Sequence, residues 1–98
     1  MRRKRKERER REAERARLAK LDALAKREEQ VWAQVPDLLA RRSASGYDEA
    51  VAHLAELRDL AVHRNQRAAF DARLRDVLAP YMTSAALQRR LREQKLAE

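Results

Sequence analysis

The sequence predicts an all-α protein, a small bundle of about four helices with a long charged helix at its N-terminus. Apolar residues recur at spacings of three and four along almost the whole chain, and no stretch alternates apolar and polar residues with period two. The 98 residues include one glycine and two prolines, so few positions interrupt a helix. This length suits a single small domain.

The first helical face begins at Leu18, after a charged segment that holds no large apolar residue. From Leu21 to Trp32 and beyond, apolar residues at three- and four-residue spacing form one broad face over about three heptads, as in a short coiled coil. Glu28 interrupts this face. Pro36 removes a backbone hydrogen bond and crowds the preceding turn, so we expect a kink or a break near it.

The clearest predicted linker is segment 42–46, which contains the single glycine and two serines. Ser45 and Asp48 have the spacing of a capping box, so a second helix is expected over 46–64. Asn65 then forms the turn, because asparagine tolerates the left-handed conformation at a helix end.

The third helix is expected over 67–79, because Pro80 disfavours helix in the residue before it. Thr83 or Ser84 can cap a fourth helix, whose last turns are rich in arginine. Links of only a few residues join the second, third and fourth helices. Consecutive helices are therefore expected to pack as antiparallel neighbours.

The formal net charge of +8 is concentrated at the N-terminus and divides the chain in two. Residues 1–17 hold ten basic and four acidic residues, whereas residues 18–98 hold fourteen and twelve. A segment without large apolar residues cannot bury a face. We therefore predict a basic helical arm over 1–17 and a nearly neutral helical bundle over 18–98.

The basic arm favours contact with nucleic acid, either DNA or RNA. Closely spaced cations neutralise phosphates and release counterions. The arm has no aromatic residue on which a base could stack, so contact without sequence specificity is expected. A membrane is not expected as a partner, because the arm has no apolar face to insert. The predicted phosphate-contacting residues are Arg2, Arg3, Lys4, Arg5, Lys6, Arg8, Arg10 and Arg11.

Two alternatives remain open at the level of sequence. The arm could be only a solvated helix, stabilised by ion pairs four residues apart. Three such pairs are possible, namely Glu7 with Arg11, Arg8 with Glu12 and Arg10 with Glu14. The bundle could instead be a protein–protein scaffold or a homodimer that uses the apolar face of the first helix. The candidate interface residues are Leu18, Leu21, Trp32 and Val35, although core packing also explains Trp32.

Composition argues against several other classes of protein. Without cysteine there is no disulfide, thiolate metal site or cysteine nucleophile, and one glycine cannot build a glycine-rich phosphate loop. His53 and His63 form no recognised zinc pattern. We therefore expect a non-enzymatic protein without metal, cofactor or small-molecule substrate. No apolar run is long enough to span a membrane or to form a signal peptide, so a cytoplasmic location is expected.

The spacing between Trp32 and Leu96 resembles that of a known family. The pattern contains, in order, a tryptophan, LLARR, GYDEAVAHLAELRDLA, F-x-x-R-L and a final L-x-x-R-L. The matching residues are Trp32, Leu39, Tyr47, Asp48, Ala50, Leu54, Leu57, Arg58, Phe70, Arg73, Leu74, Leu87, Arg90 and Leu91. They resemble the helical C-terminal segment of some bacterial SWIM zinc finger proteins. This resemblance implies a repeat-like module that mediates contacts. It implies no zinc site, because the zinc motif needs cysteines that this chain lacks.

Overall fold

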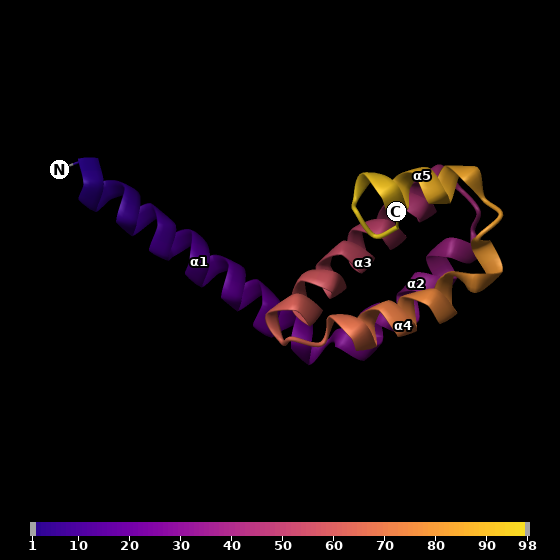
Figure 1. Cartoon of the computed structure of the whole chain (residues 1–98), viewed down its shortest axis with the longest axis horizontal. Helices are drawn as coiled ribbons and strands as arrows, with labels where there is room; N and C mark the ends of the chain where they lie inside the picture. The colour runs from indigo at the N-terminus through magenta and orange to yellow at the C-terminus, as the bar shows by residue number, and fades with distance from the viewer. Residues whose placement is uncertain (1, 98) are drawn as a thin grey trace.

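The computed structural model describes residues 2–97, with side chains from Arg5 onward. Within these residues it contains five α-helices, one short 3₁₀ helix and no strand, which confirms the predicted all-α class (Figure 1). The elements are α1 (Arg2–Lys26), α2 (Glu28–Ala40), α3 (Ala44–His63), α4 (Arg67–Leu78), η1 (Ala79–Tyr81) and α5 (Ala85–Glu93).

The first predicted helix is divided into α1 and α2, and the break lies at Arg27 rather than near Pro36. Arg27 has φ −119° and ψ 13°, outside helical geometry, and Figure 1 shows the chain changing direction there. The predicted break at Pro36 was wrong, because α2 continues through that residue to Ala40. Pro36 lies on the exposed side of α2, and buried residues precede and follow it. Packing on both sides of the proline therefore holds the helix together despite the lost hydrogen bond.

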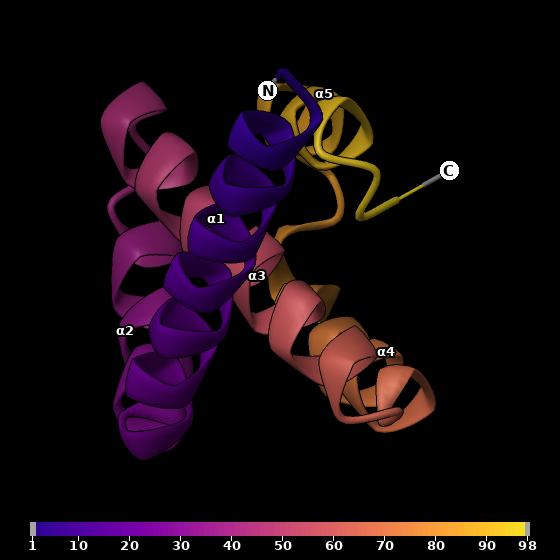
Figure 2. The ribbon, with the colours of Figure 1, turned by 90° about the vertical axis from the view of Figure 1, so that its left-hand side faces the viewer.

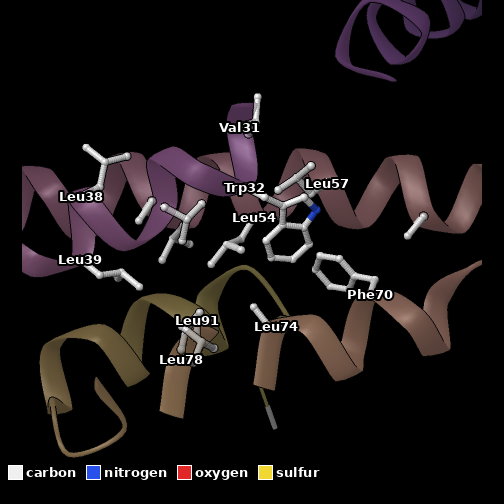
Figure 3. Close-up of a cluster of buried hydrophobic side chains, with 14 of the residues drawn as sticks. Val31, Trp32, Leu38, Leu39, Leu54, Leu57, Phe70, Leu74, Leu78 and Leu91 are labelled. Atoms are coloured by element: carbon white, nitrogen blue, oxygen red, sulfur yellow. The ribbon is translucent and has the colours of Figure 1, made fainter. Parts of the chain in front are cut away.

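Helix α3 is the centre of the bundle and packs against α1, α2, α4 and α5. One apolar core joins these helices, and Figure 3 shows its side chains converging from α2, α3, α4 and α5. Within it the ring of Trp32 lies 5.7 Å from that of Phe70, tilted by 47°. The large side chains that are fully buried are Val35, Leu39, Leu54, Leu87 and Leu91.

The link between α2 and α3 is shorter than predicted, and a different serine caps α3. The Ser43 hydroxyl accepts a hydrogen bond from the Gly46 N–H at 3.0 Å, so α3 begins at Ala44 and the predicted capping role of Ser45 was wrong. Gly46 is buried where α3 starts, and a Cβ atom there would lie 2.6 Å from the Leu38 carbonyl oxygen. The glycine therefore permits the close approach of α3 to the end of α2.

The later helix boundaries agree more closely with the sequence-based expectations. Asn65 has φ 56° and forms the expected left-handed turn between α3 and α4. Pro80 follows the end of α4 and lies inside η1. The Ser84 hydroxyl accepts from the Leu87 N–H at 3.3 Å, which identifies Ser84 rather than Thr83 as the cap of α5.

Helix α1 projects from one end of the bundle (Figures 1 and 2). Residues 5–17 are exposed, and the first buried side chains of the helix are Leu21 and Leu24. The molecule is accordingly elongated, with extents of 54 × 24 × 22 Å. The helix packs against α3, and its buried side chains lie in its last two turns.

Candidate nucleic-acid interface

The exposed part of α1 is helical because its composition favours helix and not because a core holds it. Arginine, glutamate, lysine and alanine make up all of residues 5–17, and these residues rank high in helix propensity. The predicted contact residues Arg5, Lys6, Arg8, Arg10 and Arg11 are all exposed there. The side chains of the other three, Arg2, Arg3 and Lys4, lie outside the described part of the chain.

Most of the described cations of the arm have no carboxylate partner. Among the described side chains of α1, the one ion pair joins Arg17 to Glu14 at 2.8 Å. The three pairs predicted at four-residue spacing, which would have balanced Arg8, Arg10 and Arg11, are not formed. The hydrogen bond and the charge of Arg17 lower the pKa of Glu14 below its usual range.

Six of the seven described cations of the arm form two rows along α1, and Arg5 lies between the rows on the side of Glu9 and Glu12. The first basic row contains Arg8, Arg11 and Arg15, at spacings of three and four. The second basic row contains Lys6, Arg10 and Arg17, which are four and seven residues apart, or about one and two helical turns. Acidic residues separate the rows on both sides. They are Glu7 and Glu14 on one side and Glu9 and Glu12 on the other.

The cations of the bundle differ from those of the arm because five of the fourteen are paired with a carboxylate, three of them across the fold. Arg64 at the end of α3 reaches Glu28 at 2.8 Å, and Arg90 of α5 reaches Asp48 at 2.6 Å. Glu28, which interrupts the apolar face in the sequence, thus has a charged partner. Unpaired positive charge is therefore more concentrated in the arm than the composition alone indicates.

Arg73 of α4 makes the contact that the sequence analysis missed. Its guanidinium forms two hydrogen bonds to the Glu29 carboxylate, at 2.9 and 2.5 Å, and lies 4.6 Å from the centre of the Trp32 ring. The hydrogen bond from Arg73 holds the pKa of Glu29 below its usual range. The partners are 44 residues apart, so helical periodicity carries no signal of their pairing.

The four residues predicted as a protein interface lie mostly inside the chain's own core. Leu21, Trp32 and Val35 are buried, and Leu18 is half-buried. Their apolar surface is used in packing α1 and α2 against the rest of the bundle. In this fold a partner could reach Leu18, whereas the other three side chains are covered.

An open groove lies between α4 and the residues that follow α5. Its volume is about 750 Å³, and its lining includes Leu74, Leu78, Leu96 and Met82. The side chain of Met82 is among the few large apolar groups left exposed on the described surface. This groove offers a partner an apolar surface within the described part of the chain.

Comparisons with known proteins leave the family open. No family model, curated protein or solved structure matches the chain. The resemblance to the SWIM-associated segment therefore stays a prediction. Among the described residues, no helix is long and apolar enough to cross a membrane, and no group of three or more potential metal ligands gathers.

Proposed function

We propose that the protein is a non-enzymatic binding module whose basic arm contacts the phosphate backbone of nucleic acid without sequence specificity. The observation that carries this proposal is the exposed, largely unpaired positive charge of α1. Of the described cations on this helix, Arg17 alone is paired with a carboxylate. The others are available to phosphates at little cost, because no existing ion pair has to be broken.

The chemistry of the arm suits phosphates better than bases. Arginine donates two parallel hydrogen bonds to a phosphate, and each neutralised phosphate releases condensed counterions. Residues 5–17 include no aromatic side chain for stacking and no asparagine or glutamine for pairing with the edge of an adenine. Affinity is therefore expected to depend steeply on salt and weakly on sequence.

The proposal is tested by titrating the whole chain and a variant that lacks residues 2–11 against labelled nucleic acids at several salt concentrations. Two unrelated DNA duplexes and a structured RNA serve as probes, with fluorescence anisotropy as the readout. We expect the deletion to weaken binding to all probes about equally and to flatten the salt dependence. Unchanged affinity after the deletion would overturn the proposal.

A second candidate function is a protein-contact scaffold, which the groove containing Met82 favours. Exposed apolar grooves of this kind mark contact sites more often than isolated apolar residues do. Sedimentation at micromolar concentration tests its homodimeric form. A mass above the 11.5 kDa of one chain, reduced to that value by Met82→Glu, would support it. A monomer that shows salt-dependent binding to nucleic acid would favour the first proposal.

A further inference from the structure

We infer that α1 binds within the major groove of a B-form DNA duplex, with its two basic rows contacting the phosphates of the two strands. This inference rests on the proposed function and specifies the partner. It starts from the arrangement of the cations around the helix. An α-helix turns about 100° per residue, so the centres of the rows Arg8–Arg11–Arg15 and Lys6–Arg10–Arg17 lie about 150° apart around the axis.

Two nearly opposite rows require a partner with negative charge on both sides of the helix. A flat anionic surface or a single phosphate strand can contact only one side of α1 at a time, which would leave the other row in solvent. A groove between two phosphate backbones contacts both. The side chains at 5–17 are all exposed, and the buried side chains of α1, Leu21 and Leu24, lie C-terminal to both rows, so both rows are accessible.

The dimensions of the two partners agree. An α-helix with its side chains is about 10–12 Å wide, and the major groove of B-form DNA is about 12 Å wide. The second row extends about 16 Å along the helix from Lys6 to Arg17, long enough to meet several successive phosphates. Arg17 would exchange its Glu14 partner for a phosphate, since its guanidinium remains about half exposed.

The other anionic partners fit the arm less well. The major groove of an A-form RNA duplex is too deep and narrow to admit such a helix. A single strand is usually held by aromatic stacking, and residues 5–17 contain no aromatic side chain. An interfacial membrane helix needs a face of large apolar residues, and this segment has only two alanines.

The test compares two triple variants of the full chain. The first is Arg8→Gln with Arg11→Gln and Arg15→Gln. The second is Lys6→Gln with Arg10→Gln and Arg17→Gln. Glutamine keeps the helix propensity, which far-ultraviolet circular dichroism checks. Each variant should reduce the slope of log affinity against log salt on a DNA duplex by about 2.7, since each phosphate contact contributes about 0.9.

A matched control removes three exposed cations from the bundle, with Arg75→Gln, Arg89→Gln and Arg92→Gln. We expect this variant to keep nearly the wild-type slope, and we expect the wild type to bind the DNA duplex tighter than an RNA duplex or a single strand of equal length. The inference is overturned if one row can be lost without effect, if the control loses as much, or if RNA or the single strand binds as tightly.

These outcomes separate the inference from the proposed function. If deletion of residues 2–11 weakens binding but only one of the two triple variants does so, the arm binds phosphates from one side. The inference of major-groove binding then fails, and the proposed function stands. If neither the deletion nor either triple variant changes affinity for any probe, both proposals fail. Tighter binding to phosphatidylserine vesicles than to the DNA duplex would also contradict both.

Discussion

At the scale of single residues, Gly46 marks a close approach between the start of α3 and the end of α2. A Cβ atom there would lie 2.6 Å from the Leu38 carbonyl oxygen, and a backbone atom cannot move aside as a flexible side chain can. Glycine elsewhere in a helix costs about 1 kcal/mol relative to alanine. At this position the contact should make alanine less favourable than glycine.

We therefore expect Gly46→Ala to lower the free energy of unfolding, although alanine is the better helix former. Urea denaturation followed by circular dichroism measures the change. Ala52→Gly, at an exposed site of the same helix, is the control and should also destabilise, by about 1 kcal/mol. A gain in stability from Gly46→Ala would show that α2 and α3 can separate at this point without cost.

The contact between Glu29 and Arg73 makes stability depend on acid. Because the arginine lowers the pKa of Glu29 in the folded state, protonation favours the unfolded chain. The contribution of this contact to stability is complete above the usual pKa of a glutamate and is lost as the pH falls through the lowered pKa of Glu29. Glu29→Gln should therefore reduce the loss of thermal stability between about pH 5 and about pH 2.

Thermal unfolding at a series of pH values compares this variant with Glu49→Gln, an exposed carboxylate without an ion pair in the described structure. The control should retain the acid sensitivity of the wild type. Identical pH profiles for Glu29→Gln and the wild type would mean that the contact with Arg73 does not persist in solution. Arg73 would then act mainly through its position over the Trp32 ring, an interaction worth about 0.5–1 kcal/mol at exposed sites.

At the scale of elements, the sequence predicts helices well and their ends less well. The periodic apolar faces correctly indicate the regions of α3, α4 and α5, and Asn65 correctly marks a turn. Local rules fail where distant packing decides. Pro36 remains inside α2 because residues on both sides of it are buried, while the chain breaks at Arg27, which carries no breaking signal.

The same reasoning applies to the candidate site. The exposure of the basic arm follows from its composition, since no residue of 5–17 can fill a core. The ion pairs that join different helices of the bundle could not be predicted, because partners such as Arg64 and Glu28 are 36 residues apart and meet only after folding. Which cations remain unpaired is consequently a property of the fold as well as of the sequence.

The start of α3 provides a test of one helix boundary. Ser43→Ala should lower the free energy of unfolding by about 1 kcal/mol, because its hydroxyl accepts the Gly46 N–H at the N-terminus of the helix. Ser45→Ala, one residue inside the helix, should change stability little. Chemical denaturation of both variants decides the question, and a larger loss from Ser45→Ala would place the cap where the sequence motif alone predicts it.

At the scale of the whole molecule, the arm and the bundle should be thermodynamically separable. No described side chain of residues 5–17 is buried, so the arm adds little to the core. Removing residues 2–11 should leave the thermal midpoint nearly unchanged while reducing the total helical signal. Differential scanning calorimetry and circular dichroism measure these quantities independently. A drop of several degrees would show that the arm stabilises the bundle by contacts along its length.

The projection of α1 from the bundle also determines how the arm can change in length. Its exposed turns have no packing partner, so residues can be inserted there without disturbing the core. Seven inserted residues would lengthen the arm by about 10 Å and return both basic rows to within about 20° of their present direction. Two inserted residues would instead rotate the distal cations by about 200° relative to the bundle. Insertions of seven or eleven residues, which both return the rows to within about 20°, are therefore expected to be tolerated better than an insertion of two wherever the direction of the rows matters.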